Sequence, residues 1–123
     1  MEYMALIYAN EEPWASLSDE ERADLRERYD AFTKEAQHAG VVIGGSELGA
    51  TGDATTVRVR DQETLVTDGP YAEVKEALGG YYLFECATVD EAVDWAARIP
   101  GAQHGSIEVR PVYSDPTDAE ARP

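Results

Sequence analysis

The sequence predicts an α+β fold, a ferredoxin-like βαββαβ protomer with an additional β-hairpin. The prediction rests on short apolar segments that lack helical spacing, on two segments with helical spacing behind a capping motif, and on their order. Without the hairpin, this order is strand, helix, strand, strand, helix, strand. Such an order is typical of one antiparallel sheet with both helices on one face.

The first part of the chain predicts a strand and a helix. Residues 3–8, YMALIY, are almost wholly apolar and predict a buried strand, and residues 10–17 are expected to form a loop. Ser18 and Glu21 form a capping box that begins a helix, and Gly40 is expected to end it. Apolar side chains recur along one face of this helix at Leu25, Tyr29, Phe32, Ala36 and Ala39.

The middle of the chain predicts a second strand and the additional hairpin. Residues 41–43, VVI, read as a strand that Gly44 and Gly45 interrupt. Residues 55–61 and 64–68 alternate in polarity and predict a hairpin around residues 61–63, although Asp-Gln-Glu is weak turn chemistry.

The last part predicts a strand at 80–87, a helix and a final strand at 106–113. Thr88 and Glu91 repeat the capping box, and Pro100 with Gly101 is expected to stop the helix. Residues 1–113 are therefore expected to form one domain, and residues 114–123 a polar, mobile tail.

Apolar side chains on the helix-free face of the sheet predict that a partner covers it. Residues 3–8 and 80–87 are apolar on both sides, whereas the uncovered face of a monomer's sheet should be polar. A second copy of the same sheet is the simplest cover, so we expect a homodimer with two sheets facing each other. Because strand side chains alternate, Glu108 and Arg110 should point into the space between the sheets, either as an ion pair or as part of a ligand site.

Composition excludes several classes of function. The chain has 123 residues, with 25 acidic and 10 basic side chains and a formal net charge of −15, which argues against binding to nucleic acid. No apolar run approaches the roughly 20 residues of a membrane span, and the N-terminus lacks the pattern of a secretory signal. We expect a soluble, cytoplasmic protein without a cofactor. Two distant histidines and the single Cys86, expected to be an inert core thiol, do not form a metal-binding set.

The segment at 67–80, TDGPYAEVKEALGG, concentrates charge ahead of a buried strand. Asp68-Gly69-Pro70 has the residues of a tight turn, and Gly79-Gly80 allows a close backbone approach. Between them lie Glu73, Lys75 and Glu76. This concentration of charge suggests the mouth of a cleft.

The stretch TDGPYAEVKEALGGYYLFE resembles the signature of the DGPF subgroup of the YCII-related family, with Tyr71 where the motif has Phe. The segments AGVVIGGSEL (39–48), VDEAVDWAARIP (89–100) and SIEVRPV (106–112) add to the resemblance. The resemblance implies a dimeric α/β-barrel of ferredoxin-like protomers.

The same resemblance implies what such a protein does. Some relatives are proposed to use a His-Asp pair in a cleft, and one removes chloride from a chlorinated aromatic diol. The helix position of that histidine is occupied here by Tyr29 or a neighbour. Proteins of the DGPF subgroup are often encoded near alternative sigma factors, which implies a protein partner.

The expected site performs acid–base chemistry of the lyase or isomerase type on a small anionic or phenolic molecule. Asp68, Glu73 or His104 would transfer the proton. The substrate would be bound by Tyr8, Tyr71, Lys75, Glu108 and Arg110. Each residue also has a structural explanation: a turn residue for Asp68, a surface ion pair for Lys75 with Glu73 or Glu76, and a strand-end core residue for Tyr8. A small-molecule or protein-binding regulatory module without turnover, or a purely structural dimer, would fit the same sequence.

Overall fold

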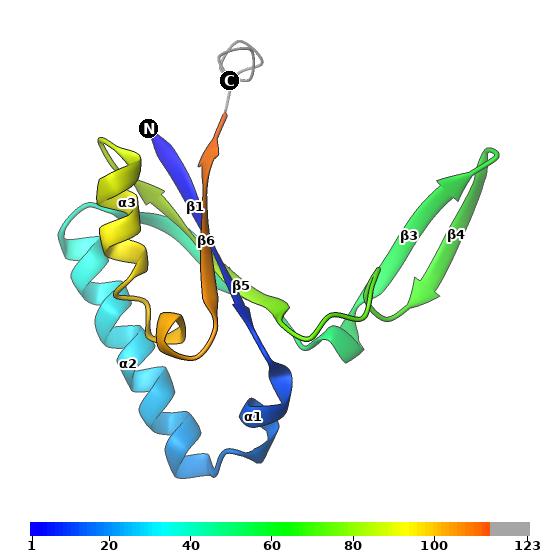
Figure 1. Cartoon of the computed structure of the whole chain (residues 1–123), viewed down its shortest axis with the longest axis horizontal. Coiled ribbons are helices and arrows are strands. Elements are labelled where there is room, and N and C mark those ends of the chain that lie inside the picture. The colour runs from blue at the N-terminus through cyan, green and yellow to red at the C-terminus, as the bar shows by residue number, and fades with distance from the viewer. Residues whose placement is uncertain (114–123) are drawn as a thin grey trace.

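A computed structural model describes residues 1–113 of the chain, so the predicted tail at 114–123 lies outside the described residues (Figure 1). The fold is a mixed α+β arrangement around a four-stranded antiparallel sheet with the order β2-β5-β1-β6. Its strands are β1 (Glu2–Ala9), β2 (Val42–Glu47), β5 (Ala77–Glu85) and β6 (Ser106–Val112). This strand order is consistent with the predicted ferredoxin-like fold.

Two helices, α2 (Asp19–His38) and α3 (Val89–Ala96), cover one face of the sheet (Figure 1). The core between them combines Phe32 and Ala36 of α2 with Ala92 and Ala96 of α3 and with strand side chains such as the fully buried Phe84. Cys86 is buried in this core, and burial raises the pKa of its thiol, as expected for an inert cysteine. No helix within residues 1–113 is long and apolar enough to cross a membrane.

The capping signals placed both long helices correctly. The Ser18 side chain accepts a hydrogen bond from the backbone N–H of Glu21, whose carboxylate accepts one from the N–H of Ser18. Gly40 follows the end of α2 with φ of +75°, the left-handed conformation that ends many helices. At α3 only half of the box forms, because Glu91 accepts from the N–H of Ala87 instead of Thr88.

The prediction of a loop at 10–17 was wrong, because residues Glu11–Ser16 form a short helix, α1. The Asn10 side chain caps it by accepting a hydrogen bond from the N–H of Glu12, at 3.0 Å. Arg22 of α2 then donates to the carbonyl oxygens of Trp14 and Ala15. These tertiary hydrogen bonds stabilise six residues that would not form a helix alone.

The prediction that Gly44 and Gly45 interrupt the strand was wrong, because both glycines lie inside β2. The register against β5 shifts between Val42 and Gly44, so Ile43 is an extra residue in a β-bulge. A Cβ atom on Gly45 would lie 2.7 Å from the carbonyl oxygen of Tyr81, and one on Gly80 would lie 2.9 Å from that of Ser46. Glycine therefore allows the two strands to pass close together.

The additional hairpin forms an arm outside the main sheet. Its strands β3 (Thr55–Arg60) and β4 (Glu63–Asp68) pair only with each other, and in Figure 1 they extend away from the sheet and helices. Asp61 and Gln62 form its turn, both with positive φ. A two-residue turn of this kind matches the twist of a hairpin even without glycine.

The helix-free face of the sheet is apolar at its centre, as predicted. Since Tyr3, Ala5, Tyr82 and Phe84 point into the core, alternation places their neighbours on the opposite face. There Met4 lies opposite Leu83, and Leu6 lies opposite Tyr81. All four side chains are only partly buried. Residues 1–113 thus leave an apolar strip without a cover.

Candidate functional site

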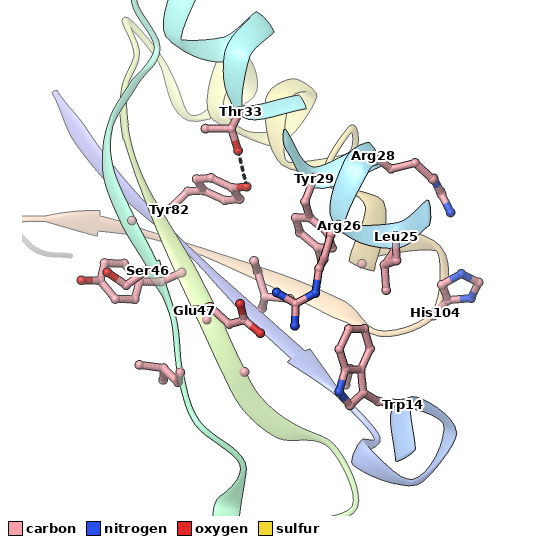
Figure 2. A pocket seen from close by; sticks show the side chains of 18 of the residues that line it. Trp14, Leu25, Arg26, Arg28, Tyr29, Thr33, Ser46, Glu47, Tyr82 and His104 are labelled. Carbon is pink, nitrogen blue, oxygen red and sulfur yellow. Dashed lines mark hydrogen bonds between the residues drawn. The ribbon is translucent and has the colours of Figure 1, made fainter. Parts of the chain in front are cut away.

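A large open cleft lies between α2 and the strands β2 and β5, with a volume of about 1970 Å³ (Figure 2). Its walls also include α1 and the loop after α3, where Pro100–Gln103 form a short 3₁₀ helix. Because α2 and the sheet are rigid elements, their side chains hold fixed positions around the cleft.

Tyr82 and Thr33 join the two walls of the cleft. The Tyr82 hydroxyl, from β5, lies 2.7 Å from the Thr33 hydroxyl of α2, and Figure 2 shows the pair bridging sheet and helix. The Tyr82 ring also packs edge-on against Phe32, with centroids 5.3 Å apart. Desolvation raises the pKa of the Tyr82 hydroxyl, so it stays protonated at neutral pH.

Tyr29 lies one helical turn before Thr33 and reaches the loop after α3. Its hydroxyl is hydrogen-bonded with the backbone of Gly101, and burial raises the pKa of the hydroxyl despite that bond. A Cβ atom at position 101 would lie 2.5 Å from the Tyr29 hydroxyl oxygen and 3.3 Å from Ile7. Glycine at 101 therefore makes room for the tyrosine. Pro100 and Gly101 were expected to stop the second helix, but α3 already ends at Ala96, and the two residues instead shape the cleft.

Arg26 and Glu47 bring opposite charges into the same cleft. Figure 2 shows Arg26 pointing from α2 and Glu47 pointing from β2 towards the space between helix and sheet. Within residues 1–113 neither side chain forms a hydrogen bond or an ion pair. A cationic and an anionic group are therefore both available to a molecule in the cleft.

The helix α1 contributes Trp14 to the cleft and is fastened at both ends. Arg22 holds its C-terminal part, and the Arg22 guanidinium lies 5.6 Å from the Trp14 ring centroid. At its first residue, Glu11 accepts hydrogen bonds from the N–H (2.9 Å) and hydroxyl of Thr51. These bonds lower the pKa of the Glu11 carboxyl. The indole is thus held at one wall of the cleft.

Of the eight site residues that the sequence predicted, only His104 lines this cleft. Glu108 and Arg110 lie exposed on the helix-free face, opposite Leu6 and Met4 of β1. The suggested ion pair between them is absent from the described part of the chain, where the two lie two residues apart on an edge strand. Tyr8 lies at the bulge of β1 and is half-buried outside the main core cluster.

The remaining predicted residues lie on the arm or on the connector that returns from it. The connector's turn is tied to β3: Thr56 donates to the carbonyl oxygen of Gly69 (2.8 Å), and Arg58 to that of Tyr71 (3.0 Å). Asp68 and Tyr71 therefore belong to the arm. Glu73 and Lys75 are exposed, and neither forms an ion pair within residues 1–113.

Sequence reasoning missed Arg26, Glu47, Trp14 and Tyr82. One signal was present: Arg26, Tyr29 and Thr33 have the spacing i, i+3, i+7 and so share one helical face. Tyr29 also belongs to the apolar face with Phe32 and Ala36, so the two faces lie side by side along the helix. Glu47 follows Gly44-Gly45, and nothing local to that segment indicates that its side chain will face a cleft.

Comparison with known proteins identifies the family. The sequence matches the YCII-related domain over residues 1–114. The chain belongs to the YCII-related family. An uncharacterised protein of Rhizobium meliloti (strain 1021) is similar to this YCII-related chain, with 39% identity over 114 residues, which covers 91% of the chain and 92% of the relative. In the described part of this YCII-related domain, no three His, Cys, Asp or Glu side chains gather as a metal-binding group.

Proposed function

We propose that the cleft binds a small anionic or phenolic molecule and performs acid–base chemistry on it. The observation that carries the proposal is that Arg26 and Glu47 point into one cleft without partners of their own, beside two half-buried tyrosines. Both side chains are solvent-exposed, so neither needs a partner for stability, and both are free to bind a charged group at this concave surface.

Each side chain has a chemical role in this proposal. The Arg26 guanidinium binds a carboxylate through two parallel hydrogen bonds, or donates to the single oxygen of a phenolate. Tyr29 and Tyr82 remain protonated, because burial raises the pKa of both hydroxyls, so they donate hydrogen bonds to developing negative charge. Trp14 offers an aromatic surface for a ring. Glu47 accepts the proton from the substrate, and His104 at the rim is a second candidate for proton transfer.

Binding without turnover is the second candidate, and one observation favours it. Tyr29 and Tyr82 each already have a hydrogen-bond partner, so their hydroxyls shape the cleft and are not free to donate to negative charge that develops in a reaction. In that case the chain is a ligand-binding module, which would present its acidic surface to a protein partner. A link with an alternative sigma factor stays a prediction from the resemblance to the DGPF subgroup.

NMR of the isotope-labelled full chain tests the binding site. Salicylate, benzoate and catechol serve as probes, and we expect amide shifts to cluster around Thr33 and Glu47. Arg26→Met should weaken salicylate binding at least tenfold, whereas Arg60→Met on the arm should leave it unchanged. The absence of saturable shifts with all three probes, or shifts confined to other surfaces, would remove the proposed site.

Deuterium exchange separates the enzyme from the binding module. Acetoacetate is small, anionic and carries an acidic C–H group, so a catalyst should speed its exchange in D₂O above the rate in buffer. Glu47→Gln should abolish this acceleration while the affinity for acetoacetate changes less than threefold. If exchange in wild-type protein equals that in buffer although acetoacetate binds, the non-catalytic alternative is favoured.

We also infer that a second copy of the chain covers the helix-free face. The apolar strip of Met4, Leu6, Tyr81 and Leu83 supports this, because soluble proteins rarely leave such a strip at the centre of a sheet open. Sedimentation of the purified full chain over a range of concentrations tests it. A monomer at every concentration would contradict the proposed homodimer.

A further inference from the structure

The arm carries a row of exposed valines on one of its two faces. Val57 lies opposite Val66, and Val59 follows two residues after Val57, so alternation places all three on the same face. Their exposed fractions are 60% for Val57, 59% for Val59 and 64% for Val66. The opposite face carries Arg58 and Arg60 beside Leu65 and Glu63.

The protein's own body does not cover this valine face. The arm is a separate two-stranded sheet that leaves the main body (Figure 1). Two-stranded hairpins on their own are marginally stable in water and need packing against a hydrophobic surface. Exposed strands with an apolar face are also sites of unwanted association, unless a specific partner covers them.

We propose that the valine face of the arm packs on a second copy of this chain. The inference deepens the homodimer proposed above and rests on it. A stable interface buries about 800 Å² on each partner, which four partly buried side chains of the helix-free strip do not supply. The three valines, each about 60% exposed, add apolar surface to that of the strip. In a dimer with two-fold symmetry, each chain offers one arm and receives one, so both arms are covered.

The turn at 68–71 is bound to the other face of the arm. Its hydrogen bonds run to Thr56 and Arg58 of β3, and Gly69 also donates to the carbonyl oxygen of Ala54, at 2.7 Å. Tyr71, with 76% of its surface exposed, is therefore positioned by the arm. Thr56 and Arg58 point to the face opposite the valines, so the turn and Tyr71 lie outside the proposed contact.

Sedimentation of a triple variant tests the arm in the full-length chain. We expect Val57→Thr, Val59→Thr and Val66→Thr together to raise the dimer dissociation constant at least tenfold. Threonine keeps the shape and the strand preference of valine, so the arm should still form. The matched control is Val93→Thr on α3, whose side chain is 49% exposed, and it should leave the dissociation constant unchanged.

The possible outcomes distinguish the arm inference from the homodimer proposal. If wild-type protein dimerises and the triple variant dimerises equally tightly, the arm inference is overturned while the homodimer stands. If wild-type protein stays monomeric, the homodimer proposal fails and the arm inference with it.

Photo-crosslinking adds a measurement that needs no destabilising substitution. A benzophenone amino acid in place of Thr64, which lies opposite Val59 on the valine face, should give covalent dimers on illumination, whereas the same probe at position 93 should not. Crosslinks from position 64 that form only within one chain would overturn the arm inference, whatever the sedimentation result.

Discussion

The hydroxyl of Tyr82 lies 2.7 Å from the hydroxyl of Thr33, and this hydrogen bond joins the central sheet to α2 inside the cleft. Thr33→Val removes the partner and should lower the free energy of unfolding by about 1 to 2 kcal/mol, because a half-buried hydroxyl loses its bond. Urea unfolding of Thr33→Val, Tyr82→Phe and the double variant measures the coupling. We expect a coupling of about 1 kcal/mol. Additive effects would show that the bond contributes nothing.

Gly101→Ala should place a methyl group against the Tyr29 hydroxyl. Because the Cβ would lie 2.5 Å from that oxygen, we expect the free energy of unfolding to fall by about 1 to 3 kcal/mol. The control is the same substitution in a Tyr29→Phe background, where the oxygen is absent and much of the loss should be recovered. Equal losses in both backgrounds would mean that the clash lies elsewhere, for example against Ile7.

The bond between Glu11 and Thr51 should break in acid. The carboxylate of Glu11 accepts hydrogen bonds from the hydroxyl and N–H of Thr51, so the pKa of Glu11 lies below its ordinary value of 4.5. A lowered pKa in the folded state means that this stabilisation is present above pH 4.5 and is lost as the pH falls through the lowered pKa.

An NMR titration of the Thr51 amide proton checks this pH dependence. In wild-type protein its shift should titrate with a midpoint below 4.5, and Glu11→Gln should remove that transition. Glu12→Gln, a neighbouring change on the same helix, should leave it in place. A Thr51 shift that does not respond to Glu11→Gln would contradict the assignment.

Asp68→Asn and Arg110→Met should leave the stability of the single chain nearly unchanged. Both side chains are exposed, and neither forms an ion pair within residues 1–113, so we expect effects within about 0.5 kcal/mol. Thermal unfolding at low protein concentration measures the fold, and mass in solution measures association. A large loss for either variant at low concentration would mean that its side chain supports the protomer itself.

The fold was predictable because local signals and the apolar pattern agreed. The capping residues Ser18 and Thr88 placed the two long helices, and alternation in β6 separated Ile107 and Val109 from Glu108 and Arg110. The predictions of secondary structure failed where tertiary contacts determine the local conformation. Nothing local to residues 11–16 shows that Arg22 and Thr51 will hold them in a helix, and Gly44-Gly45 reads as a break until β5 is known to pass close by.

The candidate site was less predictable than the fold. His104 was proposed because its loop is close in sequence to Glu108 and Arg110; the loop does line the cleft, and the role of His104 stays a prediction. Arg26 and Glu47 come from segments about twenty residues apart in the sequence, and only the packing of α2 over β2 brings them into one cleft. The charge at 68–76 predicted the mouth of a cleft, but the turn in this segment is hydrogen-bonded to β3 of the arm and does not line the observed cleft.

The close passage of β2 and β5 has a consequence for how ligand preference can evolve. At Gly45 and Gly80 a side chain of any size would collide with the backbone of the opposite strand, so this part of the cleft cannot be reshaped by single substitutions. The facing surface of α2 has no such restriction, because Arg26 can be exchanged without touching the sheet backbone. Relatives that recognise different molecules should therefore differ first along that helical face, while the glycine-lined floor beneath it stays the same.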